Sequence, residues 1–233
     1  MSLSLPPEKV QEYFKQKGFQ ITWNWDEMCQ EAHNRSFTVA KVMKEDILKD
    51  IRQMVDRAID EGLTFQQFKK ELTPQLQAKG WWGIQEIDGK EVQLGSPYRL
   101  KTIYRTNIDV AYSVGRYQEL TEQVDFAPYW QYVAVMDART SEFCRIHNGQ
   151  VYRYDSPFWN YGYPPNHWGC RSAVRNYTEE DLREKGLKVS PVPDIQTVNA
   201  EISGKKVKTV VINGAKMQPE WSYNPGKDYL RVK

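Results

Sequence analysis

The sequence has few of the residues that mark specialised protein classes. Among its 233 residues there are three cysteines and three histidines. An odd number of irregularly spaced cysteines argues against a disulfide framework and for a reducing compartment. No segment approaches the roughly eighteen consecutive apolar residues that a transmembrane helix needs. We therefore expect neither a disulfide scaffold nor a membrane span.

Excess charge of either sign is also lacking. The 32 basic and 30 acidic side chains leave a formal net charge of +2, which is not the electrostatic footprint of a protein whose main task is to grip duplex DNA. The N-terminal segment reads MSLSLPPEKVQEYF and has no positive region followed by an apolar one, so we expect no secretory signal. What remains is an ordinary globular composition, 40% apolar and 27% charged, rich in tryptophan and tyrosine.

The first half of the chain has the periodicity of helices. Residues 44–62 place apolar side chains on one face at helical spacing, and a glycine ends the pattern. Thr64 and Gln67 fit a capping box at the start of a second helix. A long helix is predicted for residues 96–119, which begin with Ser-Pro. Between these helices, Asp88-Gly89 is a candidate hairpin turn.

The second half contains more β-branched and aromatic residues. Strands are predicted for Tyr129–Met136, Gln150–Tyr154 and Arg171–Asn176. Residues 205–213 alternate like an edge strand whose lysines discourage aggregation. Residues 189–197 contain prolines and are expected to form a linker.

These patterns predict an α+β fold with two parts. Residues 1–125 form a helical N-terminal region. Residues 126–233 form a small α+β region with short antiparallel strands and a loop that contains cysteine and histidine.

Two of the cysteines and two of the histidines lie close together in the second part. Their order is Cys144-x2-His147, then nineteen residues, then His167-x2-Cys170. Zinc prefers four thiolate or imidazole ligands, and each short knuckle supplies two. Four protein ligands would make a closed, structural site, whereas three would leave a position open for catalysis. The alternative is that the cysteines are small buried hydrophobes and the histidines are simply hydrogen-bonded.

A polar cluster precedes the first cysteine, at the end of a predicted strand. In one interpretation, Asp137 and Thr140 satisfy loop amides. In the other, Asp137, Arg139 and His147 form a polar cluster at a strand end, where active sites often lie. No nucleophile with an evident activating base accompanies them, which argues against catalysis.

The order of the motifs resembles the phage Mu F-like minor head proteins, also called phage head morphogenesis proteins. The motifs are D-x-R-T, C-x3-N-G-x-V, D-x-P-F-W and Y-P-P-N-x-W-x-C-R, which together span residues 137–171. Upstream blocks also resemble the family, including AHNRSFTVAK at 32–41 and the helix that begins at Ser96. The motif residues expected to shape this region are Asp137, Arg139, Thr140, Gly149, Trp159, Pro164, Pro165, Trp168 and Arg171.

The resemblance implies a virion-assembly protein rather than an enzyme. Such a protein binds the portal, scaffold or major capsid protein, without a membrane, and at most contacts packaged DNA weakly. It is expected in the host cytoplasm during assembly and afterwards in the interior of the virion head. The alternatives are a zinc-dependent nuclease or hydrolase that uses Asp137, His147 and His167, and a DNA-binding module that acts during packaging.

Two departures from the family pattern bear on the metal. Related proteins often have cysteine at the position of Ser141 and a C-R-C ending, where this chain has Ser172. Other members have histidine at the Cys144 position and none at the His167 position. The chain combines both patterns, and two outcomes are open: one structural zinc held by Cys144, His147, His167 and Cys170, or no metal.

Overall fold

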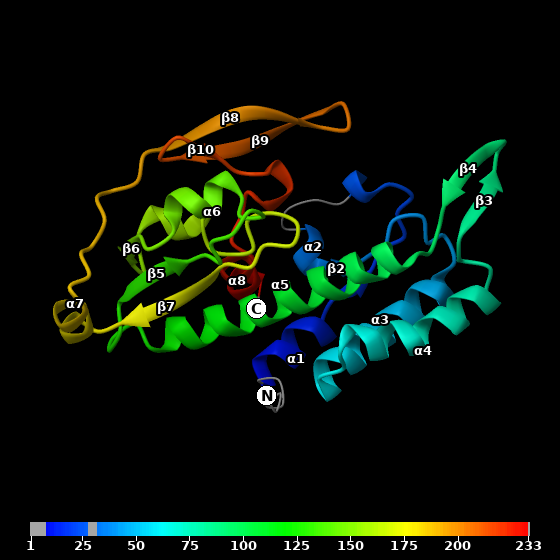
Figure 1. Cartoon of the computed structure of the whole chain (residues 1–233), viewed down its shortest axis with the longest axis horizontal. Coiled ribbons are helices and arrows are strands. Elements are labelled where there is room, and N and C mark those ends of the chain that lie inside the picture. Colours follow the sequence, from blue (N-terminus) through cyan, green and yellow to red (C-terminus); the bar gives the residue numbers. More distant parts are fainter. Residues whose placement is uncertain (1–7, 28–31, 233) are drawn as a thin grey trace. The chain divides into compact units, whose positions relative to one another are not determined.

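The computed structural model describes residues 8–27 and 32–232, and it confirms the α+β fold class. Two compact units divide the chain within helix α5 (Pro97–Glu122), the first extending to Tyr112 and the second beginning at Ser113. Helices dominate the first unit, and small antiparallel sheets dominate the second (Figure 1). The predicted division at residue 125 remains a proposal about independent folding.

Four helices form most of the first unit. They are α1 (Glu8–Lys15), α3 (Glu45–Glu61), α4 (Phe65–Ala78) and the first part of α5. The apolar stripe of α3 is buried, and Gly62 ends this helix in a left-handed conformation with φ 68°. The predicted capping box of Thr64 and Gln67 is present at the start of α4.

Arg52 of α3 is a buried cation with a structural task. Its guanidinium donates to the carbonyl oxygens of Phe14, Lys15 and Lys17, at the end of α1. The last carbonyls of a helix have no partner within the helix, so Arg52 satisfies groups that would otherwise be buried without hydrogen bonds.

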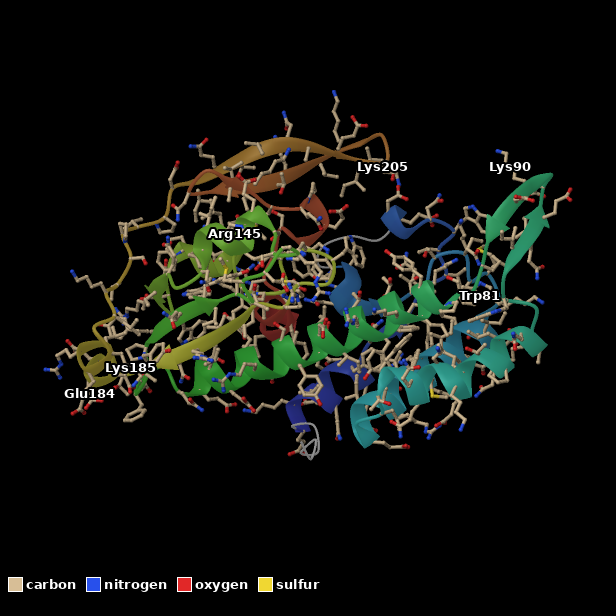
Figure 2. The ribbon with its side chains drawn as sticks, viewed as in Figure 1. Trp81, Lys90, Arg145, Glu184, Lys185 and Lys205 are labelled. Carbon is tan, nitrogen blue, oxygen red and sulfur yellow. The ribbon has the colours of Figure 1, made fainter. Side chains whose placement is uncertain are left out.

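A hairpin of β3 (Ile84–Ile87) and β4 (Lys90–Gln93) extends from the first unit. Its turn is Asp88-Gly89, as predicted, and both residues have positive φ. Trp81 anchors the base: its indole donates to the carbonyl of Lys41, and Arg99 lies 5.0 Å above its ring. Figure 2 shows Trp81 at the base and Lys90 near the far end.

Shorter elements complete the first unit. They are β1 (Gly18–Phe19), η1 (Trp25–Glu27), α2 (Ala32–Arg35) and β2 (Ser36–Phe37). Strands β1 and β2 pair in parallel.

The first sheet of the second unit has the order β6-β5-β7 and is antiparallel. Its strands are β5 (Tyr129–Val133), β6 (Val151–Arg153) and β7 (Ala173–Tyr177). The three predicted strands are therefore confirmed, although β5 ends three residues before Met136. Helix α6 (Glu142–His147) and η2 (Pro157–Asn160) lie in the connections, and α7 (Glu179–Lys185) follows β7.

The second sheet corrects two predictions. Its order is β10-β9-β8, with β8 at Ile195–Ile202, β9 at Lys205–Ile212 and β10 at Ala215–Lys216 (Figure 1). The strand predicted as an edge is central, because a Ser203-Gly204 turn pairs it with β8 and an Asn213-Gly214 turn pairs it with β10. The predicted linker accordingly ends where β8 begins.

A core of aromatic side chains holds the second unit together. Trp130, Trp159 and Tyr163 are almost completely buried, and Tyr117 of α5 packs edge-on against Trp130 and Tyr163. The chain then forms η3 (Pro219–Trp221) and α8 (Pro225–Val232). None of the helices in the described part of the chain has the length and apolarity to cross a bilayer.

Candidate metal centre

Two short segments bring the cysteines together. Cys144 lies in the first turn of α6, where its amide donates to the hydroxyl of the N-cap, Ser141. His167 and Cys170 lie in the loop that follows the cis Pro164–Pro165 peptide bond. The Cys170 amide donates to the His167 carbonyl over 3.1 Å, so a tight turn aims both side chains at one point.

Cys144, His167 and Cys170 form one group of potential ligands. Their ligand atoms all lie within 4.8 Å of one another, and the two sulfurs are 3.8 Å apart. In a tetrahedral site with Zn–S bonds of about 2.3 Å, two thiolates would stand about 3.8 Å apart. Both cysteines are buried, and His167 is half-buried. The three side chains therefore fit a zinc ion.

The electrostatics of the group favour a thiolate. Hydrogen bonding from Cys170, followed by that from His167, Ser141 and Ser172, lowers the pKa of Cys144 well below its usual range against the opposing effect of burial. The hydrogen bond to Cys144, with burial, raises the pKa of Cys170 well above its usual value. Cys144 is thus the cysteine of the pair that is favoured as a thiolate, and a thiolate is the form that binds metals.

The pKa of His167 shifts in the direction opposite to that of Cys144. Burial alone would lower the pKa of His167, but the hydrogen bond to Cys144 and the charge of that thiolate outweigh burial and raise it. Nδ1 of His167 lies 3.0 Å from the carbonyl of Trp168. The raised pKa favours a proton on His167 beside Cys144, and metal binding would release that proton.

Tyr132 is a positioning residue that the sequence reading did not single out. Its hydroxyl lies 3.1 Å from Sγ of Cys144 and 2.8 Å from Oδ1 of Asn166. The amide of Asn166 in turn donates to the carbonyls of Tyr161 and Tyr163. Tyr132 thereby joins α6 to the proline-containing loop. In β5, buried residues alternate with partly buried ones, and this alternation is the sequence signal that placed Tyr132 in the interior.

His147, the fourth predicted ligand, is not part of the group. Its side chain is fully buried, with ring centroids 4.3 Å from Phe143 and 5.1 Å from Phe158. Nδ1 lies 2.8 Å from the Phe143 carbonyl, and Nε2 has no hydrogen-bond partner among the described residues. Burial lowers the pKa of His147. The structure thus brings together three of the four predicted ligands, and the four-ligand set stays a prediction.

Asp137 and Arg171 form a salt bridge that closes the loop region. Two guanidinium nitrogens of Arg171 lie 2.7 and 2.6 Å from the two carboxylate oxygens of Asp137. These bonds hold the pKa of the Asp137 carboxyl well below its usual range. Since Arg171 directly follows Cys170, this salt bridge fixes the backbone next to the ligand group.

The rest of the D-x-R-T motif supports the same salt bridge. The Arg139 amide donates to Asp137, the Asp137 amide donates to the Thr140 hydroxyl, and that hydroxyl donates to the Val135 carbonyl over 2.6 Å. Arg145 of α6, labelled in Figure 2, donates to the carbonyls of Asp137 and Thr140. Each polar group is therefore occupied in holding the loop.

The remaining motif residues also have structural contacts. Trp159 is buried and donates to the Arg153 carbonyl; Gly149 has φ 84° and donates to the Tyr132 carbonyl. Trp168 is 39% exposed and lies edge-on to Trp221 at 5.1 Å. Within the described ranges, Asp137, His147 and His167 do not form one group that could hold a metal.

Comparisons with known proteins agree with the motif order. The family described as "Phage Mu protein F like protein" matches residues 49–175. The chain is 45% identical over 240 residues to the "Putative capsid assembly protein F" of Escherichia phage Mu, covering 95% of this chain and 54% of that protein. It is 41% identical over 219 residues to the "Mu-like prophage FluMu F protein" of Haemophilus influenzae, covering 88% and 53%.

The chain thus spans about half the length of the curated relatives it matches. No solved structure matches it.

Proposed function

The chain belongs to the phage Mu F-like protein family, and from this premise we propose that it is a minor capsid protein that acts in phage head assembly. The name of the phage Mu relative, with 45% identity across 95% of this chain, supports this function. We propose that the protein binds the portal, the scaffold or the major capsid protein. Its places of action would be the host cytoplasm during assembly and then the interior of the head.

One observation favours a structural role over a catalytic one. The polar groups of the 137–171 segment are used to hold its own backbone: Asp137 is bound by Arg171, and His147 is enclosed by aromatic rings. The salt bridge holds the pKa of Asp137 well below its usual range and so makes it a weak base, and the fully buried His147 has no access to a substrate proton. This arrangement supports a scaffold that fixes a surface for docking.

We propose that Cys144, His167 and Cys170 hold one structural zinc ion. When bound, zinc would supply a cross-link between α6 and the loop after η2. The chain's own residues prepare the site, because Tyr132 and Asn166 fix the loop and the hydrogen bonds to Cys144 keep its sulfur anionic.

Co-purification with head proteins tests the assembly role. Tagged protein would be co-expressed with the portal, scaffold and major capsid proteins of its own phage, and the captured partners identified by mass spectrometry. We expect one of the three to be captured. Absence of the chain from both procapsids and virions would refute the proposal.

A pair of variants tests whether the fixed loop matters for docking. Asp137→Asn removes one charge of the salt bridge to Arg171, and we expect weaker capture of the partner. Asp155→Asn is the matched control, because Asp155 is exposed and, among the described residues, its salt bridge is with Arg153 at 3.7 Å. Equal capture of the partner by both variants would show that docking does not depend on this loop.

A cleavage assay tests the alternative. If the purified chain cleaves DNA and His167→Ala abolishes that cleavage, the result would favour the hydrolase.

A further inference from the structure

A polar cavity lies in the second unit, away from the cysteine group. It has a volume of about 210 Å³ and is lined by η2 and the residue after it, by the segment before α8, and by one side of α8. Its lining includes Asn160, Tyr161, Ser222, Asn224, Lys227 and Arg231. These are hydroxyl, amide and cationic groups, so the cavity is suited to a polar ligand.

The cavity has more positive than negative charge. Lys227 and Arg231 are four residues apart on α8 and therefore face the same side of that helix. Among the described residues, the Lys227 ammonium donates to the amide oxygen of Asn160 rather than to a carboxylate, and the salt bridges found there do not include Arg231. Asp228 is the one carboxylate among the described residues of the lining. Two cations against one anion leave a net positive charge.

The two cations destabilise each other when nothing lies between them. Burial, and then the charge of Arg231, lower the pKa of Lys227. Like charges at this spacing weaken a helix. A bound anion would reverse both effects, because it would shield the cations from each other and compensate for their lost hydration.

The frame of the cavity is rigid. The Asn224 amide donates to the carbonyl of Trp159 over 2.6 Å, and its oxygen accepts the amide of Lys227. The ammonium group of Lys227 lies 2.5 Å from Oδ1 of Asn160. Since Trp159 belongs to the aromatic core, the position of Lys227 is fixed before any ligand arrives.

We propose that this cavity is an anion site that binds a phosphate group through Lys227 and Arg231. An ammonium group and a guanidinium group are the side chains that proteins use for phosphate oxygens. The phosphate could belong to free inorganic phosphate or to a nucleic-acid backbone, which have the same recognition chemistry. The site is independent of the proposed role in head assembly.

Phosphate titration of the full chain tests the site. We would record NMR spectra of the parent and of Lys227→Gln and Arg231→Gln at increasing inorganic phosphate, at constant ionic strength. Arg231 is exposed, so its substitution should not unfold the protein. We expect shifts at α8 and η2 in the parent, and binding about tenfold weaker or more in either variant. Lys188→Gln removes the same charge at another exposed position and should bind as the parent does.

A second titration identifies the source of the phosphate. Binding of a short labelled DNA duplex would be followed by fluorescence anisotropy as a function of salt. If the backbone is the ligand, each variant should lower the slope of log K against log salt by about one. If free phosphate is the ligand, only the NMR titration should respond. A parent that binds neither, or variants that bind both as the parent does, would overturn the proposal.

Discussion

Sγ of Cys144 receives hydrogen bonds from several groups that lie on separate elements. Tyr132 approaches it from β5, Ser141 caps its helix, and Cys170 and His167 come from the loop before β7. Ligand atoms held this way lose little freedom when a metal binds. The side chains nearest to His147 are aromatic instead, and they offer its imidazole no second metal ligand.

Substitutions of single ligands should separate three-ligand from four-ligand binding. We expect Cys170→Ser to abolish bound zinc and His147→Gln to retain it, because His147 lies outside the group. Metal content per folded protein would be measured by elemental mass spectrometry, with circular dichroism as the control for folding. Loss of zinc from the folded His147→Gln variant would show that His147 is a fourth ligand.

Acid should lower the free energy of unfolding through protonation of His147. Burial lowers the pKa of His147 in the folded state, so the unfolded chain binds the proton more tightly. Stability attributable to His147 is therefore present above the unfolded pKa of about 6.5 and lost as pH falls below it. The pKa of His167 is raised in the folded, metal-free chain, so its protonation stabilises the folded state as pH falls.

Urea unfolding at several pH values isolates this effect. In the presence of a chelator, the parent should lose more stability between about pH 7.5 and pH 5.5 than His147→Gln does. The contribution of His167 is common to both proteins, so the difference between them belongs to His147. Identical pH profiles would show that His147 is not a buried neutral base.

At the scale of elements, local signals predicted the helices well. The apolar stripe and terminal glycine of α3 and the capping box of α4 depend on residues close in sequence, and each was confirmed. The position of β9 could not be read from its alternation. Ser203-Gly204 and Asn213-Gly214, the turns that make it central, were available in the sequence and are the better signal.

The candidate site was predictable only in part, for a geometric reason. Spacing showed that Cys144 and His147 are three residues apart and able to share a helix face. It did not show that Phe143 and Phe158 enclose the imidazole. Nor could it show that Tyr132, distant in sequence, reaches the sulfur. Contacts of this kind are set by tertiary packing, which a pattern of residue types does not encode.

The contact between α8 and α5 predicts an unusually sensitive glycine. A Cβ atom at Gly226 would lie 2.4 Å from Cβ and Cγ of Tyr117, both in the rigid core of the second unit. We expect Gly226→Ala to cost about 1–3 kcal/mol by overpacking, measured by urea unfolding. Gly18→Ala is the control, since its Cβ would meet no atom closer than 3.7 Å. Equal losses in both would contradict this contact.

At the scale of the whole molecule, the extent of the aromatic core predicts where a fragment of the second unit must begin in order to fold on its own. The aromatic core includes Tyr117 and Leu120, both of which lie in α5. A fragment of residues 126–233 lacks them and exposes the faces of Trp130 and Tyr163 that Tyr117 covers. We therefore expect residues 113–233 to unfold cooperatively on heating and residues 126–233 not to do so, as followed by near-ultraviolet circular dichroism. Cooperative unfolding of the shorter fragment would support the boundary at residue 125.

Removal of metal should weaken the second unit without unfolding it. Small zinc domains unfold when metal is chelated, because they have little other core. Here Trp130, Trp159 and Phe158 belong to a large aromatic core that the metal does not supply, and the Asp137–Arg171 salt bridge remains. Zinc at about 100 times its Kd should add about 2.7 kcal/mol, so the melting temperature should fall with chelator and recover with zinc. Cys144→Ser should melt as the chelated parent does, with or without zinc. Complete loss of near-ultraviolet circular dichroism on chelation would mean that the metal, rather than the aromatic core, organises this unit.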